Sequence, residues 1–205
     1  MSGLIGKKIG MTSVYTADGQ ALACTVIEAG PCVVTQVRTE ETDGYKAVQL
    51  GFGEKKEKHT TQPLMGHFKK AGTTPKRKLV EFKEFEEGLA LGQALSVTDV
   101  FVEGDFVDVV GTVKGRGFQG SVRRWGFNGG PATHGSKFHR RPGSSGNRTW
   151  PGRVMPGKKF PGHLGDETVT VKNVVVVDVL ANEGVLVVKG PVPGAKNSLV
   201  RLAKV

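Results

Sequence analysis

Cysteine and long apolar runs are scarce in this 205-residue sequence, and each shortage excludes a class of protein. The two cysteines, Cys24 and Cys32, are too few for a disulfide-stabilised scaffold or a cysteine-only zinc site. Each lies in an apolar, strand-like run, which predicts buried, reduced thiols in a cytoplasmic protein. The longest purely aliphatic runs, such as Val174 to Val177, are far too short to span a bilayer, and the first residues lack the apolar stretch of a signal peptide. No membrane association is therefore predicted.

Acidic residues are absent from one long stretch, residues 111–165, which contains 11 of the 29 Lys and Arg and none of the 19 Asp and Glu. The rest of the chain then has 18 bases and 19 acids, so the formal net charge of +10 is local to this stretch. The stretch holds 14 of the 30 Gly and 5 of the 10 Pro, but only four branched aliphatic residues. Such a segment buries too little apolar area to offset the entropy of ordering its backbone, and its positive charges repel one another. A polyanion would neutralise and order it, and nucleic acid is the best candidate.

The remainder of the chain is predicted to be mainly β, because short apolar runs alternate with turn signals such as Asp18-Gly19 and Gly30-Pro31. We expect strands at residues 4–15, 21–27, 32–37, 45–52, 79–85, 94–98, 106–112, 167–171, 173–180 and 185–189, with a final edge strand at 199–202. A polar excursion over residues 54–78 contains one short helix, residues 63–70. The simplest architecture is one globular antiparallel β-barrel or sandwich formed by residues 1–112 and 165–205. Residues 113–164 project from it as a long, irregular basic extension.

Several motifs suggest an enzyme, but the sequence around each lacks the residues that the corresponding site requires. Gly115 to Gly120 matches GxGxxG, but a dinucleotide site needs an acidic residue about 20 positions later, and the next acid is Asp166. The three histidines of the segment, His134, His139 and His163, match no zinc spacing. No carboxylate within the segment could orient a histidine as a base. We therefore predict no enzymatic activity, no cofactor and no small-molecule substrate.

Basic and aromatic residues alternate in the segment, which favours RNA as the partner, because guanidinium groups bind phosphates and aromatic rings stack on unpaired bases. Trp125 and Phe127 have two interpretations, since they either stack on bases or anchor the extension to the barrel. The predicted RNA-binding residues are Lys114, Arg116, Arg123, Arg124, Trp125, His134, Lys137, His139, Arg140, Arg141, Arg148, Trp150, Arg153, Lys158 and Lys159. The alternative is a free-standing architectural nucleic-acid-binding protein, but Gly and Pro interrupt every candidate reading helix.

Three long motifs resemble the bacterial large-subunit ribosomal protein L-three (L3) family, and the resemblance covers essentially the whole chain. They are GLIGKKIGMTSVYTADGQALACTVIEAGPCVVTQV, GTVKGRGFQGSVRRWGFNGGPATHGSKFHRRPGSSG and PGRVMPGKKFPGHLGDETVTVKN. The resemblance implies a β-barrel similar to those of translation factors and a place on the cytoplasmic ribosome among neighbouring large-subunit proteins. It also implies binding of 23S ribosomal RNA, a part in early subunit assembly, and an extension that reaches toward the peptidyl transferase centre.

The same resemblance indicates the tip of the extension. The tip is expected at Gly143, Ser144, Ser145, Gly146, Asn147 and Arg148. Some relatives carry a methylated glutamine where this sequence has Asn147, so that modification is not carried over.

Overall fold

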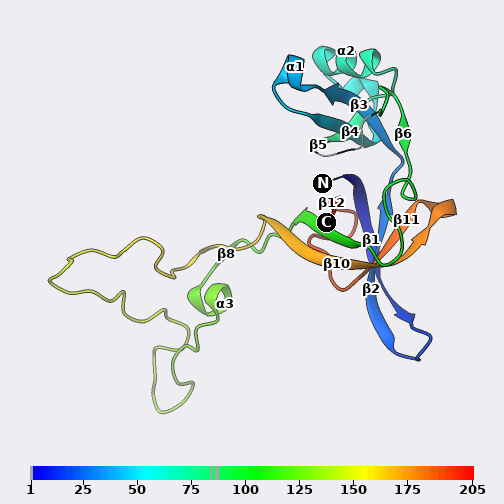
Figure 1. Cartoon of the computed structure of the whole chain (residues 1–205). Coiled ribbons are helices and arrows are strands. Elements are labelled where there is room, and N and C mark those ends of the chain that lie inside the picture. Colours follow the sequence, from blue (N-terminus) through cyan, green and yellow to red (C-terminus); the bar gives the residue numbers. More distant parts are fainter. Residues whose placement is uncertain (1, 84, 86–87) are drawn as a thin grey trace. The chain divides into compact units, whose positions relative to one another are not determined.

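Strands dominate the fold because valine-rich runs and glycine-containing turns alternate along most of the chain. The computed structural model, which describes residues 2–83, 85 and 88–205, separates into two units (Figure 1). Unit 1 comprises Met1–Val113 and Thr168–Val205, and unit 2 comprises Lys114–Glu167. Within the described residues, no helix has the length and apolar character needed to cross a membrane.

Six antiparallel strands of unit 1 form a closed barrel in the order β1-β12-β7-β10-β11-β2. They are β1 (Gly3–Tyr15), β2 (Ala21–Ala29), β7 (Phe106–Thr112), β10 (Thr168–Leu180), β11 (Val185–Lys189) and β12 (Leu199–Lys204). The barrel closes where the first and last strands pair, with Gly3 opposite Ala203. A side chain at Gly3 would collide with the Leu202 carbonyl oxygen and the Phe82 ring, so this close approach requires glycine. The closed barrel confirms the prediction of a mainly β, antiparallel barrel fold.

Two strand predictions differ from the barrel. Residues 199–202 were expected at a sheet edge, but β12 lies between β1 and β7, because closure of the barrel pairs it on both sides. Residues 167–171 and 173–180 were expected as two strands, but β10 is continuous, with an irregularity between Val171 and Val174. Asn173 has a positive φ of 54°, which asparagine tolerates, and its N–H donates to Asp108 Oδ1 at 2.9 Å. The strand therefore bends without breaking.

A four-stranded antiparallel sheet, in the order β5-β4-β3-β6, forms the other part of unit 1 (Figure 1). Its strands are β3 (Cys32–Arg38), β4 (Ala47–Glu54), β5 (Lys76–Phe82) and β6 (Ala94–Leu95), and the short helices of unit 1 are α1 (Glu40–Asp43), η1 (Glu57–His59), α2 (Gln62–Lys70) and η2 (Ala181–Glu183). The predicted helix at 63–70 is confirmed by α2, which has proline in its first turn and buries Phe68. The strand expected at 79–85 begins at Lys76 and ends at Phe82, and Glu84 lies outside the described residues.

One apolar core joins the barrel to the four-stranded sheet. Leu4, Ile27 and Leu202 of the barrel are fully buried with Leu50 and Phe82 of the sheet. Both cysteines are buried and free, as predicted. Cys32 Sγ donates to the Ile5 carbonyl oxygen at 3.4 Å, and burial raises the pKa of its thiol to about 11. The Cys32 thiol is thus held in its unreactive, protonated form, and both cysteines are buried in the packing of unit 1.

Candidate nucleic-acid interface

Unit 2 begins and ends in a short antiparallel pairing of its own two chain segments. β8 (Phe118–Gln119) pairs with β9 (Gly162–His163). Beyond this pair, Arg116 N–H donates to the Leu164 carbonyl oxygen at 2.8 Å, and Leu164 N–H donates to the Gly117 carbonyl oxygen at 3.0 Å. The glycine-rich motif therefore forms part of a hydrogen-bonded stem. It does not form the strand–turn–helix of a dinucleotide site, since only the five-residue α3 (Ser121–Trp125) follows it.

The Phe160 carbonyl oxygen accepts hydrogen bonds from two of the predicted RNA-binding side chains. Arg124 Nη1 donates to it at 3.0 Å and Trp125 Nε1 donates to it at 2.9 Å. The Arg124 guanidinium also lies 4.8 Å from the centroid of the Trp125 ring, and Lys159 Nζ lies 5.6 Å from the same ring. Gly162 has no side chain where the Arg124 guanidinium packs. Arg124 and Trp125 thus clamp the two sides of unit 2 together, although 41% of Trp125 remains exposed.

Backbone hydrogen bonds shape the loop between α3 and the predicted tip. Gly130 N–H donates to the His139 carbonyl oxygen at 2.8 Å, and Arg141 N–H donates to the Phe138 carbonyl oxygen at 2.9 Å. The His139 ring nitrogen Nδ1 lies 3.1 Å from the Pro131 carbonyl oxygen. His139 is therefore oriented by its own loop, while its exposed ring leaves Nε2 available to a partner.

The predicted tip is held by side chains that bond to the backbone. Gly146 N–H donates to Ser144 Oγ at 3.1 Å, and Asn147 Nδ2 donates to the Arg153 carbonyl oxygen at 2.8 Å. Asn147 has a positive φ of 59°, a conformation that asparagine adopts more easily than most residues. Residues 141–150 are all exposed. Backbone and side chains at the tip are thus available for contact with another molecule.

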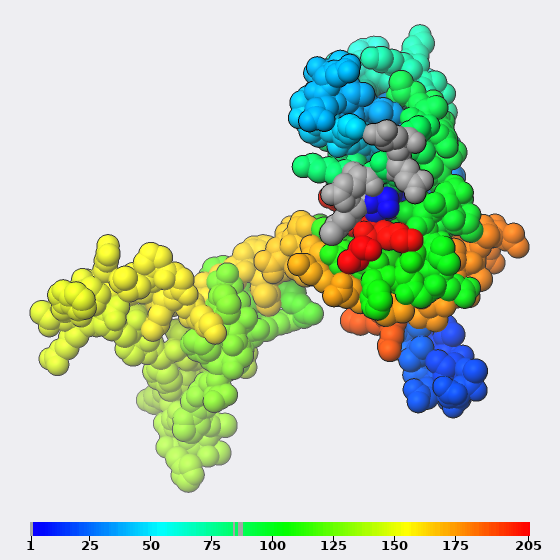
Figure 2. Space-filling view, viewed as in Figure 1, coloured from blue at the N-terminus to red at the C-terminus, as the bar shows by residue number. Residues whose placement is uncertain are grey.

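Exposure is the property that the predicted RNA-binding residues share. Fourteen of the fifteen are exposed, and Arg124 is half-buried. Trp150 is 88% exposed, so its ring offers a free face for stacking. Figure 2, which draws most of unit 2 in yellow-green and yellow, shows this part of the chain as thin lobes. The 11 bases of unit 2 face only two acids, Asp166 and Glu167, both at its end. The unit is a surface of unneutralised positive charge.

Phe118 is an exposed residue that the sequence-based list of binding residues omits. Its side chain is 74% exposed and lies on β8, between Arg116 and the clamp residues. An aromatic residue so accessible in a basic segment is suited to stacking. The signal was present in the sequence, since Phe118 follows Arg116 and Gly117 in the acid-free stretch.

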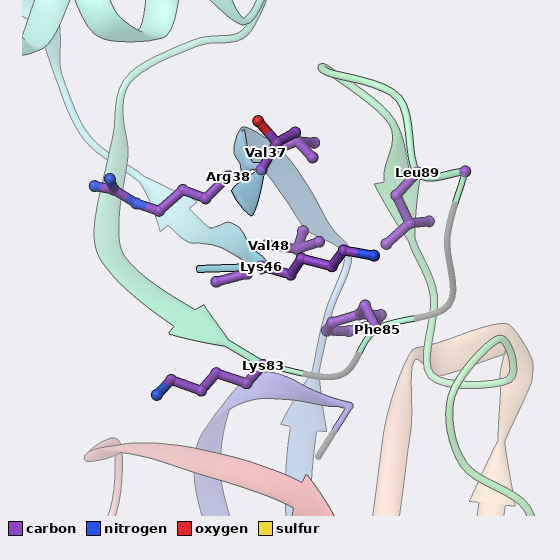
Figure 3. A pocket seen from close by; sticks show the side chains of 10 residues that line it. Val37, Arg38, Lys46, Val48, Lys83, Phe85 and Leu89 are labelled. Carbon is purple, nitrogen blue, oxygen red and sulfur yellow. The ribbon is translucent and has the colours of Figure 1, made fainter. Parts of the chain in front are cut away.

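A second feature, an apolar cavity of about 550 Å³ in the four-stranded sheet of unit 1, does not resemble a polar binding site. Figure 3 shows Val37, Val48, Phe85 and Leu89 among its lining side chains. Arg38 also lines it, but its guanidinium donates to Asp43 at 2.7 Å and to Glu81 at 2.9 Å. Hydrogen bonding to Glu81 raises the pKa of Arg38 further above its usual value. The positive charge of Arg38 is thus paired with acidic residues of the same protein.

In the part of the chain that the structure describes, no group of histidine, cysteine or acidic side chains has the arrangement of a metal site.

Comparison with known proteins gives a consistent result. The Ribosomal protein L3 family profile matches residues 64–184, more than half of the chain. A protein of Bdellovibrio bacteriovorus named "Large ribosomal subunit protein uL3" is 54% identical over 206 residues, which cover 100% of this chain and 93% of the relative. A protein of the same name from Alkaliphilus metalliredigens is 51% identical over 201 residues, which cover 98% of this chain and 95% of the relative.

Proposed function

Because the chain belongs to the ribosomal protein L3 family, we propose that it is a structural constituent of the large ribosomal subunit and that residues 113–164 bind the RNA of that subunit. The family is a structural component of the ribosome and not an enzyme. Residues 1–112 and 165–205 are the globular domain of this proposal. Its partners are large-subunit RNA and neighbouring large-subunit proteins on the cytoplasmic ribosome.

The observation that carries the RNA-binding proposal is the exposed, acid-free positive surface of unit 2. Eleven bases lie on a segment that buries almost no apolar side chain, so the segment gains little from packing against itself. Phosphates of RNA would neutralise these bases and release counterions, which provides the missing stabilisation. Glycine and proline allow the backbone to follow an irregular RNA surface. Recognition is mainly of shape, phosphate and 2′-hydroxyl, because paired RNA hides its base edges from side chains.

The tip and the assembly role are finer parts of the proposal. The resemblance of residues 111–146 to the central signature of the family supports a path of this segment through ribosomal RNA toward the peptidyl transferase centre. The full exposure of residues 143–148 is compatible with contacts at such a tip. Early binding to the RNA would let the protein help to start subunit assembly.

The test measures the affinity of the full-length protein for large-subunit RNA as a function of salt. If roughly 6–10 phosphate contacts form, affinity falls by about 10³–10⁵ between 50 and 200 mM salt. Replacing Arg140, Arg141, Lys158 and Lys159 with glutamine should lower the slope of log affinity against log salt by about 3–4. A nearly flat salt response of the wild-type protein would contradict the proposal.

The matched control is the double variant Lys56→Gln and Lys58→Gln. These two bases are exposed in unit 1 and interleaved with Glu54 and Glu57, so their loss should leave the salt slope unchanged. Co-sedimentation of the protein with intact large subunits, rather than with free nucleic acid, separates the ribosomal function from that of a free-standing architectural protein.

A further inference from the structure

A second concentration of bases lies outside unit 2, in a cleft of unit 1. The cleft has a volume of about 500 Å³ and lies between β5, the edge strand of the four-stranded sheet, and barrel strands β7, β10 and β12. All of its lining residues belong to unit 1. None of them is one of the predicted RNA-binding residues.

Three positive side chains line this cleft, and the described residues that line it include no acid. Arg77 and Lys78 come from β5 and Arg201 comes from β12, while no Asp or Glu is among the lining residues. Within the described residues, none of the three bases makes an ion pair. Unit 1 as a whole has 18 bases and 17 acids. Three unpaired bases in one cleft are therefore a local excess of positive charge on a nearly neutral unit.

Arg201 has a donor that none of the described residues of the protein satisfies. Its Nε is buried and has no hydrogen-bond partner among the described residues. The guanidinium lies 4.8 Å from the centroid of the Phe82 ring, and this stacking fixes its plane. A buried, unpaired donor of a charged group is costly for the folded protein unless a ligand accepts from it. Arg201 is half-buried and lines the cleft, so the other nitrogens of its guanidinium, rather than Nε, could donate to an oxyanion there and neutralise its charge.

Neutral donors complete the lining. Thr112 of β7 and Thr168 of β10 are directly paired across the sheet, and both line the cleft. Asn197, whose side chain is an amide, also lines the cleft. The cleft thus combines guanidinium, ammonium, hydroxyl and amide groups, which is the donor set that binds phosphate. It contains no aromatic residue on which a base could stack.

We propose that this cleft binds a backbone phosphate of large-subunit RNA, with Arg201 as the central donor and Arg77 and Lys78 at its rim. The inference rests on the proposed function, since it takes RNA as the partner. It assigns a phosphate contact to the globular domain, separate from those of unit 2. The exposure of Arg77 and Lys78 lets a phosphate on the outside of an RNA helix reach the cleft.

The experiment compares Arg201→Met with wild type in the full-length protein. The variant should reduce the slope of log affinity for large-subunit RNA against log salt by about 1, the effect of one phosphate contact. Thermal unfolding of the free variant should occur at the wild-type temperature or above it, because the substitution removes an unpaired buried donor. A purely structural arginine would give the opposite pair of results, with lower thermal stability and an unchanged salt slope.

The exposed pair Arg77→Gln and Lys78→Gln tests the same cleft without touching the core, and should lower the salt slope by about 1–2. Lys56→Gln with Lys58→Gln is again the control. The cleft inference is wrong, and the proposed function stands, if both cleft variants keep the wild-type salt slope of RNA affinity while the four-glutamine variant of unit 2 lowers that slope. If the unit 2 variant has no effect either, the proposed function itself fails. Binding of inorganic phosphate in the cleft, seen as NMR shifts at Thr112 and Thr168, with no change in RNA affinity of the variants, would also overturn the assignment to RNA.

Discussion

Units 1 and 2 differ in apolar burial and in charge balance, and therefore in what can stabilise their folded structure. Every buried hydrophobic residue that the structure describes lies in unit 1, where 18 bases balance 17 acids. In unit 2, all of which is described, Ser121 is the only buried residue, and 11 bases face two acids. Unit 1 is stabilised by its own core. Unit 2 has a defined path but no apolar core of its own, so in the proposed function RNA would supply most of its stabilisation.

The local order of unit 2 comes from a few backbone hydrogen bonds and from side chains that donate to backbone carbonyl oxygens. Arg124 and Trp125 share the Phe160 oxygen, and Asn147 bonds to the Arg153 oxygen. Exposed or part-buried bonds of this kind contribute little net stability, because water competes for both partners. The comparison teaches that a chain can specify the route of a segment without making that segment independently stable.

The largest expected difference between the units is in resistance to protease. Trypsin should cut the free protein first between Arg123 and Lys159, because local opening of unit 2 needs little free energy, whereas opening the barrel needs about 5–15 kcal/mol. The two remaining pieces should stay together in gel filtration, since β10, β11 and β12 pair with β7, β2 and β1. Large-subunit RNA should slow the cleavage. Equal rates of cutting in the barrel and in unit 2 would remove the distinction between them.

A smaller but substantial difference is expected for truncation of side chains. Leu202 is fully buried, so Leu202→Ala should lower the free energy of unfolding by about 2–5 kcal/mol. Met155 in unit 2 is 48% exposed, so the matched variant Met155→Ala should change the free energy of unfolding by less than about 0.5 kcal/mol. Urea unfolding monitored by circular dichroism measures the free energy of unfolding of both variants. A comparable loss in the two variants would show that unit 2 has a core of its own.

The smallest expected effect concerns the ion pair between Asp105 and Lys204 within unit 1. Burial acts to raise the pKa of Asp105, but hydrogen bonds from Lys204 and the Val102 N–H, with the charge of Lys204, outweigh it and hold the pKa below its usual value. Asp105→Asn should therefore lower the free energy of unfolding by about 1 kcal/mol at neutral pH.

The pH dependence of that loss has a definite sign. A carboxyl whose folded pKa is lowered stabilises the protein above its unfolded pKa, about 3.9, and this contribution is lost as pH falls through the lowered value. The stabilities of wild type and Asp105→Asn should thus begin to converge as pH falls below about 4 and become equal below the lowered pKa of Asp105, as measured in urea titrations. Asp18→Asn, at an exposed turn, serves as the control and should have little effect at either pH. A difference that persists at pH 2 would contradict the ion-pair explanation.

The sequence predicted features that depend on local pattern and missed those that depend on distant pairing. Alternating apolar runs located nearly all strands of unit 1, and the shortage of branched aliphatic residues in residues 111–165 indicated a segment that buries little apolar area. Nothing local to residues 199–202 indicates that they pair with β1, nearly 200 positions earlier, so an edge strand was expected. Likewise, no pattern around Arg124 indicates that the carbonyl oxygen of Phe160 holds it. Which bases of unit 2 contact RNA stays a prediction.

The order of the barrel strands has a consequence for the newborn chain. Both neighbours of β7, the strands β10 and β12, follow residues 114–167 in the sequence. At roughly 5–20 residues per second, several seconds separate the synthesis of β7 from that of β12. In the later part of that interval, once residue 167 has been added, the nascent polypeptide carries a complete polycation together with a half-built barrel that has open strand edges. RNA that captured the polycation at this stage would hold the unfinished protein in solution while its remaining strands emerged.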